Sequence, residues 1–233
     1  MLTIEKFFSL RESLYKYKKQ NTAILRGKCH NIKSILMAHI SEIRNYHRLN
    51  APEWNVFRVM GMEHYEVAFH TPFLFELLSP HGTHAQGRLF LESFLRMIGV
   101  FPEDEITHPN WYVGRETGRI DLRIANNLLQ KAVFIENKID TSAHSGQLST
   151  YYRSWQKDYP NGGAFIYLTI DGVKPPDSGF NSEYSTRVEV ETNLQLLSYK
   201  VHIKTWLENN LESIKPEKLK QSLIQYIETE VAG

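Results

Sequence analysis

Two short stretches decide the expected fold: GRIDLR at residues 118–123 and FIENK at residues 134–138. From Ile120 to Ile124, apolar side chains alternate with more polar ones, which is the period of a half-buried strand. Residues 132–135 form an apolar run that predicts a second, more buried strand. Asn126-Asn127 between them is typical of a turn, because Asn tolerates a positive φ. The sequence therefore predicts a hairpin.

The predicted hairpin concentrates charged groups at one end. Alternate side chains of a strand share a face, so Glu136 and Lys138 point to one side and Asn137 to the other. If the pairing brings Asp121 to the first side, two carboxylates and an ammonium group meet there. Close carboxylates repel each other unless a cation lies between them. Mg²⁺ or Mn²⁺ suits such a site, because these ions prefer oxygen ligands and accept phosphate oxygens.

Two further groups complete this hypothesis. The carbonyl of Asn137 offers another metal ligand, and Lys138 could orient or deprotonate an attacking water, or neutralise charge on a phosphate. The ordinary alternative is a hairpin with a surface Glu–Lys pair. A charge triplet at the end of an apolar strand is costly unless it is compensated, which favours the catalytic interpretation.

These motifs, in their order and spacing, resemble the PD-(D/E)XK nuclease superfamily. Ile120-Asp121 stands where the family name has Pro-Asp, and Glu136-Asn137-Lys138 supplies the (D/E)XK part. The resemblance runs from about Asn55 to the C-terminus. The other matching pieces are residues 55–57, Glu66, His70-Thr71, 77–80, 84–87, Gln147-Leu148, Tyr151, 167–169, 198–200 and Trp206-Leu207.

The resemblance implies an α/β fold with a restriction-endonuclease-like core, in which helices flank a central mixed β-sheet. The core would occupy residues 55–233, and residues 1–54 would form a basic helical extension at the N-terminus. The implied activity is metal-dependent hydrolysis of phosphodiester bonds in DNA or, less often, in RNA. Such an enzyme could serve restriction, defence or repair in bacteria.

The resemblance also implies roles for individual residues. Asp121 and Glu136 would be the central metal ligands, Glu66 would complete the metal shell, and Lys138 would be the catalytic lysine. Gln147 would lie near the scissile phosphate. Tyr151 follows one helical turn later and shares its face. The chain departs from the family in the turn at residues 140–146, which lacks the acidic residue that relatives often carry near Ala143.

Three arginines surround the predicted carboxylates. Arg115, Arg119 and Arg123 could contact phosphate in bidentate fashion, so we expect them to bind nucleic acid together with Tyr151. The alternative is that these arginines pair with Glu116 and neighbouring acids.

The N-terminal part is basic. Residues 1–50 hold ten Lys and Arg against three acids, whereas the rest of the chain holds seventeen against twenty-three. This asymmetry suggests contact with a polyanion, although a solvated helical face explains it equally well. Helical spacing of apolar residues over 7–17 and 32–43 predicts two helices, arranged as a hairpin. That hairpin could clamp nucleic acid or form a homodimer through its apolar stripe.

Composition restricts the function classes. The single cysteine, Cys29, excludes an intramolecular disulfide framework and fits a reducing cytoplasm. No apolar stretch reaches the length of a membrane helix, and the N-terminus lacks the pattern of a secretion signal. We therefore expect a cytoplasmic protein without a membrane partner. The rival function is a nuclease fold kept as a binding or assembly module, but adjacent carboxylates facing phosphate would not help a pure binder.

The remaining elements follow from periodicity and turn residues. The patterns predict helices over 86–98, 147–158, 194–212 and 218–231, core strands over 111–113 and 164–170, and an edge strand over 183–192. Residues 64–78 have helical spacing, but Pro72 implies either a kink or a new helix with Thr71 as N-cap. His70 in this stretch is expected to be a hydrogen-bonded scaffold residue.

Overall fold

A computed structural model describes residues 4–117, 120–141, 143–180, 184–229 and 231 of the chain. The chain divides into two units, Met1–Trp54 and Asn55–Gly233. Within the described residues, no helix is both long and apolar enough to cross a membrane.

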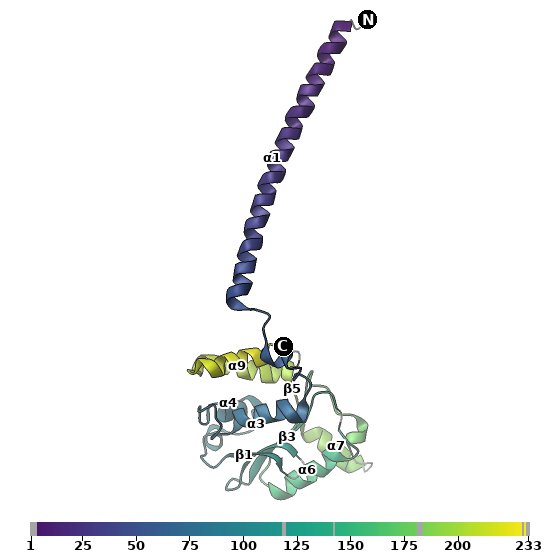
Figure 1. The fold of residues 1–233 in the computed structure, drawn as a ribbon. Helices are drawn as coiled ribbons and strands as arrows, with labels where there is room; N and C mark the ends of the chain where they lie inside the picture. Colours follow the sequence, from purple (N-terminus) through teal and green to yellow (C-terminus); the bar gives the residue numbers. More distant parts are fainter. Residues whose placement is uncertain (1–3, 118–119, 142, 181–183, 230, 232–233) are drawn as a thin grey trace. The chain divides into compact units, whose positions relative to one another are not determined.

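The first unit is one uninterrupted helix, α1 (Ile4–Asn50), of 47 residues (Figure 1). The predicted helical hairpin is therefore wrong. Gly27 lies inside the helix, and a single glycine costs only about 1 kcal/mol there relative to alanine. Ala51 follows with φ of 41° and donates its N–H to the carbonyl of His47 at 2.8 Å, which ends the helix.

The second unit is built on a five-stranded mixed sheet in the order β1-β2-β3-β4-β5. The strands are β1 (Tyr112–Thr117), β2 (Ile120–Asn126), β3 (Lys131–Lys138), β4 (Gly163–Thr169) and β5 (Leu194–Ser198). The first three are antiparallel neighbours, and β4 and β5 continue the sheet in parallel. The predicted hairpin is confirmed as β2–β3, with Leu122 opposite Ile135.

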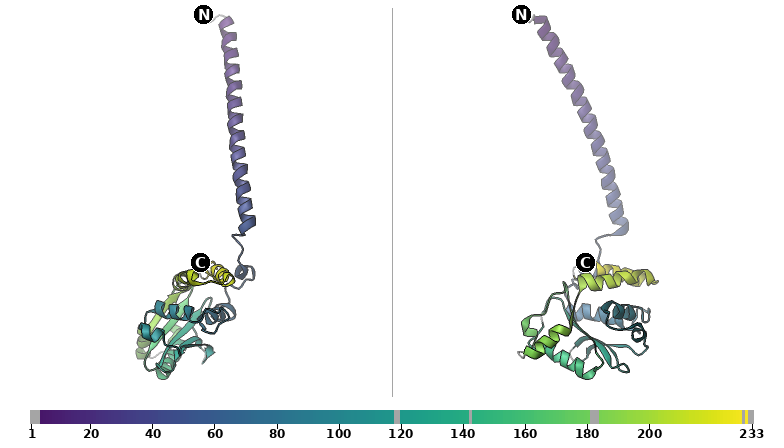
Figure 2. Two further views of the ribbon diagram at one scale, coloured as in Figure 1. Left: turned by 90° about the vertical axis from the view of Figure 1, so that its left-hand side faces the viewer. Right: turned by 180° about the vertical axis from the view of Figure 1, so that it is seen from behind.

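Helices cover both faces of the sheet (Figures 1 and 2). The larger apolar cluster joins one face to α3 (Thr71–Leu78), α4 (Leu89–Ile98), α8 (Lys204–Asn210) and α9 (Glu217–Ile227). A smaller cluster joins the other face to α6 (Gln147–Asp158) and α7 (Tyr184–Asn193). Because both faces are covered, β3 and β4 are almost continuously buried, which explains their uninterrupted apolar runs. The expected restriction-endonuclease-like architecture is confirmed.

Short elements complete the unit. They are α2 (Val56–Val59), η1 (Glu66–His70), α5 (Glu103–Ile106), η2 (Asp177–Gly179), η3 (Tyr199–Ile203) and η4 (Leu211–Ser213).

Two predicted elements are wrong. The expected edge strand over 183–192 falls partly outside the described residues, and its described part lies in helix α7. The expected helix over 194–212 begins instead with strand β5, which pairs with β4, and becomes helical only afterwards. Val190 of α7 is fully buried against the α6 side, so tertiary packing overrides the strand propensity of its branched side chain.

The stretch around Pro72 forms two joined helical segments. η1 runs directly into α3, and Pro72 lies in the first turn of α3, where its missing N–H is not needed. His70 is buried between them, with Nδ1 2.7 Å from the Tyr226 hydroxyl and Nε2 2.7 Å from the Glu63 carbonyl. Burial lowers the pKa of His70, so a neutral imidazole joins the end of η1 to α9 and to the chain before η1, as expected of a scaffold residue.

Candidate active site

Predicted charged side chains meet where β3 ends. Glu136 and Lys138 are alternate residues at the end of β3, and their side chains lie 2.7 Å apart (Oε1 to Nζ). Glu66 reaches the same place from η1, and Gln147 reaches it from the first position of α6. Residues from three separate elements therefore converge on one strand end.

Glu136 is the most buried member of this group. Its exposed fraction is 0%, and its Oε1 accepts hydrogen bonds from Gln147 Nε2 at 2.8 Å and from Lys138 Nζ. Oε2, by contrast, has no hydrogen-bond partner in the part of the chain that the structure describes. Burial, together with repulsion from Asp121, raises the pKa of Glu136 to about 8, although Lys138 opposes this rise.

Asp121 lies beside Glu136 at the start of β2. The register that pairs Leu122 with Ile135 continues to place Asp121 next to Glu136. Asp121 Oδ2 accepts the backbone N–H of Asn137 at 2.8 Å, so its side chain takes the place of a ladder hydrogen bond. This bond fixes the Asp121 carboxylate toward β3 and brings two acids together, as the sequence predicted.

Lys138 is enclosed by acids. Its Nζ lies 2.7 Å from Glu136 Oε1 and 3.2 Å from Glu66 Oε1. Burial disfavours its charged form, but the combined attraction of the neighbouring carboxylates, with Glu136 first, raises its pKa above the ordinary value. The amine is therefore a stable cation, which suits charge neutralisation and orientation better than proton abstraction.

Glu66 uses both oxygens to bind the end of β3 and the residues that follow it. Oε1 contacts Lys138, while Oε2 accepts from the Ile139 N–H and the Thr141 hydroxyl, both at 2.9 Å. These contacts hold Lys138 and the chain after β3 in place. The role of Glu66 as a metal ligand stays a prediction, because these protein groups occupy its oxygens here.

Gln147 links the helix to the acids. Its Oε1 accepts the His144 N–H at 2.9 Å, and its Nε2 donates to Glu136 and to the Tyr151 hydroxyl at 3.0 Å. Burial raises the pKa of Tyr151, so its hydroxyl stays protonated at neutral pH and remains a donor. The predicted Gln147–Tyr151 pair thus lies within reach of the carboxylates.

Asn137 points to the opposite side of the sheet, as the alternation predicted. Its Nδ2 donates to Thr71 Oγ1 at 3.0 Å, and its Oδ1 accepts from the Tyr199 hydroxyl at 2.9 Å. Only its backbone carbonyl remains a candidate metal ligand. The sequence did not single out Thr71 and Tyr199 for this role, although the buried polar position between Glu136 and Lys138 was a signal that partners would be needed.

Two of the three predicted arginines, Arg115 and Arg123, lie against aromatic rings. The guanidinium carbon of Arg115 lies 5.9 Å from the centre of the Phe75 ring, on the α3 side of the sheet, and that of Arg123 lies 5.9 Å from the centre of the Tyr112 ring. Arg119 falls outside the described residues. Nucleic-acid binding by these arginines stays a prediction.

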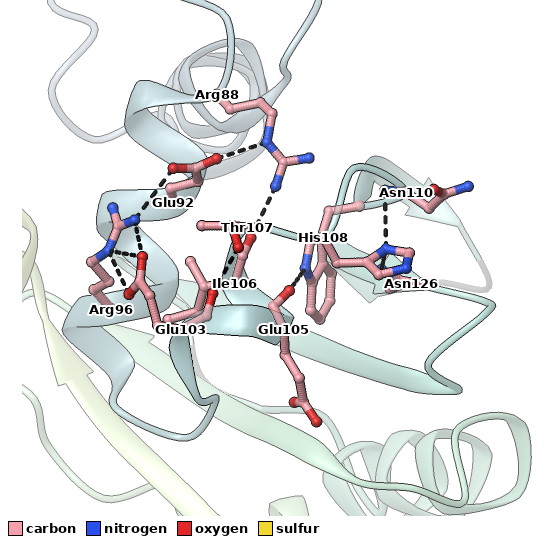
Figure 3. Close-up of polar contacts among 11 residues, drawn as sticks. Arg88, Glu92, Arg96, Glu103, Glu105, Ile106, Thr107, His108, Asn110 and Asn126 are labelled. Carbon is pink, nitrogen blue, oxygen red and sulfur yellow. Dashed lines mark hydrogen bonds and ion pairs between the residues drawn. The ribbon is translucent and has the colours of Figure 1, made fainter.

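A second group of charges lies around α5 and supports the scaffold (Figure 3). Arg88 and Arg96 both bind Glu92, and Arg96 also binds Glu103. Nearby, Asn126 contacts His108 at 2.8 Å. Acids and bases alternate here, so the charges compensate one another.

One further ion pair near α5 involves the first residue of β3. Lys131 Nζ lies 2.6 Å from Oε1 of Glu105 in α5, so β3 has a lysine paired with a glutamate at each end. The Glu105–Lys131 pair therefore gives a matched control for variants at the other end of β3.

The donor set at the end of β3 fits a divalent cation. Among the described residues, no three or more His, Cys, Asp or Glu side chains are already grouped to hold a metal. Two carboxylates, Asp121 and Glu136, are available, and Mg²⁺ is commonly bound by one or two carboxylates with several waters. The unsatisfied Oε2 of Glu136 is the group that such an ion would satisfy.

Comparison with known proteins places these residues in one family segment. A family model described as PD-(D/E)XK nuclease superfamily matches residues 54–228, which include Glu66, Asp121, Glu136, Lys138 and Gln147. No curated protein and no solved structure matches the chain. The match begins after α1, which lies outside it.

Proposed function

Because the chain belongs to the PD-(D/E)XK nuclease superfamily, we propose that it is a metal-dependent nuclease that hydrolyses phosphodiester bonds in DNA. The proposed cofactor is Mg²⁺ or Mn²⁺. The observation that carries this proposal is the buried Oε2 of Glu136, which lacks a hydrogen-bond partner among the described residues and belongs to an acid beside Asp121. A structural hairpin would gain nothing from two such acids, because a buried unsatisfied carboxylate oxygen destabilises the fold.

The protein groups divide the chemistry between them. Asp121 and Glu136 would hold the cation, which supplies Lewis-acid stabilisation of negative charge on the phosphate when bound. Lys138, a cation held between Glu136 and Glu66, would orient the attacking water and neutralise charge that develops on the phosphate. Gln147 holds the orientation of the Glu136 carboxylate through its Nε2 hydrogen bond, and the family resemblance implies that it would lie near the scissile phosphate.

Cleavage of a substrate panel tests the proposal. Supercoiled plasmid, linear duplex, single-stranded DNA and RNA would each be incubated with Mg²⁺, Mn²⁺ or EDTA. The variants Glu136→Gln and Lys138→Met remove the two groups at one end of β3. The matched controls Glu105→Gln and Lys131→Met remove the ion pair at the other end.

We expect metal-dependent cleavage of DNA that is lost in both site variants and kept in both controls. Cleavage of RNA alone would change the substrate class. A folded wild-type protein that binds Mg²⁺ in calorimetry but cuts none of the substrates would favour the alternative, a nuclease fold that binds nucleic acid without turnover. Cleavage that persists in Glu136→Gln would refute the assigned site.

A further inference from the structure

Helix α1 carries a row of large apolar side chains that are exposed within its own unit. Eight of them are between 52% and 65% exposed: Leu10, Leu14, Tyr17, Leu25, Ile32, Leu36, Ile43 and Tyr46. Protein helices are stabilised mainly by packing of their apolar face, and extended exposed apolar surface marks an interaction site. A helix of 47 residues with this surface is therefore expected to have a partner.

The spacing of these side chains is that of a coiled coil. Together with Asn21, Cys29 and His39 they recur at intervals of three and four residues from Leu10 to Tyr46, and we call these eleven residues the seam. The intervals alternate as in heptads, except for consecutive steps of four between Tyr17 and Cys29. These steps amount to two insertions of four residues, called stutters, which coiled coils accommodate by local unwinding.

Of the ten Lys and Arg residues of α1, six lie on the side away from the seam, and the other four, Lys6, Arg11, Lys18 and Lys28, flank it. At 3.6 residues per turn, the six that project more than a quarter turn from the seam's centre line are Lys16, Lys19, Arg26, Lys33, Arg44 and Arg48. Pairing along the seam would therefore leave these charges in solvent. The seam itself holds no Lys or Arg, so a polyanion would find its cations beside the seam and on the far side of the helix rather than along it.

We propose that the seam binds the seam of a second copy of this chain, forming a parallel two-stranded coiled coil. The helix is about 70 Å long at 1.5 Å per residue. Eight apolar side chains on each helix would bury roughly 1,300 Å² in total, taking roughly 80 Å² for each. That area lies within the range of stable protein interfaces.

The parallel direction follows from Asn21. In a parallel pair in register, Asn21 faces its equivalent, and the two side-chain amides can hydrogen-bond, as a single seam asparagine does in two-stranded coiled coils. In an antiparallel pair centred on the seam, Asn21 would lie opposite the apolar segment between Ile32 and Leu36, with its amide unsatisfied. The parallel pair also brings both Asn50 ends together, so residues 51–54 tether two nuclease units.

Cys29 makes the direction measurable, because it is a seam residue and the only cysteine of the chain. The mass of the 233-residue protein would be measured by light scattering at micromolar concentration. Oxidation with diamide, which takes up the two hydrogens of two thiols, would then be followed on a non-reducing gel. Ile32→Asp/Leu36→Asp places charge in the seam. Ser34→Asp introduces the same side chain on the other side of the helix, and Cys29→Ser controls for the disulfide.

We expect twice the monomer mass for the wild type and for Ser34→Asp, with a disulfide-linked dimer in both. The double variant should be monomeric and should lose the cross-link. A monomeric wild type would overturn the proposal, as would a dimer that survives in the double variant. A dimer without the Cys29 cross-link would overturn the parallel arrangement. None of these readouts depends on nuclease activity, so failure here and failure of the proposed function are distinguishable.

Discussion

Neutralising Glu136 should stabilise the metal-free protein. The Glu136 carboxyl is fully buried, and burial with repulsion from Asp121 raises its pKa from 4.5 to about 8. Between these two values the folded protein holds a proton that the unfolded chain has released, so the free energy of unfolding falls as pH rises through this window. Above pH 8 the loss is complete and the contribution levels off.

The magnitude follows from the size of the pKa change. One pKa unit corresponds to about 1.4 kcal/mol, so the raised pKa of Glu136 lowers the free energy of unfolding by about 2 kcal/mol at pH 6 and by about 4 kcal/mol at pH 8. Glutamine removes this cost because it does not ionise. Its carbonyl can accept from Gln147 and Lys138 as the Glu136 Oε1 does, and its amide can donate toward Asp121.

Urea denaturation of the wild type and of Glu136→Gln, in EDTA from pH 6 to pH 9, measures the difference. We expect the variant to be more stable, with a gap that widens to about 4 kcal/mol by pH 8. Mg²⁺ at a hundred times its dissociation constant should then stabilise the wild type alone, by about 2.7 kcal/mol. A variant no more stable than the wild type at pH 8, or a gap independent of pH, would refute the reasoning. Glu105→Gln, which disrupts the ion pair with Lys131, should give no such stabilisation.

Further predictions concern the neighbours of Glu136 and the seam. Lys138→Met should lower kcat by roughly 10²–10³-fold while Mg²⁺ still binds in calorimetry, because the lost cation acts on the phosphate; weakened Mg²⁺ binding with unchanged kcat would contradict that role. Tyr199→Phe removes a buried hydrogen bond to Asn137 and should lower the free energy of unfolding, measured by urea denaturation, by about 1–2 kcal/mol. The control Tyr15→Phe, at an exposed position of α1, should change it by less than about 0.5 kcal/mol. Asn21→Leu should raise the thermal stability of the dimer and permit higher oligomers in sedimentation, and an unchanged melting temperature would argue against Asn21 as a seam residue.

The part of the site that could be predicted depends on local sequence. Alternation along β3 places Glu136 and Lys138 on one side of the sheet and Asn137 on the other. A short turn sets the pairing of β3 with β2, so the position of Asp121 beside Glu136 also follows from nearby residues. The network of Asn137 with Thr71 and Tyr199 joins residues more than sixty positions apart, so the local pattern shows that Asn137 needs partners but does not identify them.

The errors have equally physical causes. Residues 194–198 form a strand because they pair in parallel with β4, and the periodicity of their own sequence does not reveal this pairing. The prediction of an N-terminal helical hairpin is wrong because residues 18–31 hold one glycine and no proline, which is too weak a signal for a turn.

The charge count at the end of β3 has a consequence for how the site exchanges ions. Three carboxyl groups, of Glu66, Asp121 and Glu136, surround one ammonium group, so full ionisation leaves an excess of two negative charges. A single divalent ion restores electroneutrality, whereas a monovalent ion restores only half. In the absence of metal, the proton on Glu136 makes up part of the deficit. Uptake of the proposed metal below pH 8 would therefore be an exchange, in which the arriving cation expels a proton, and acidification would drive the ion out again.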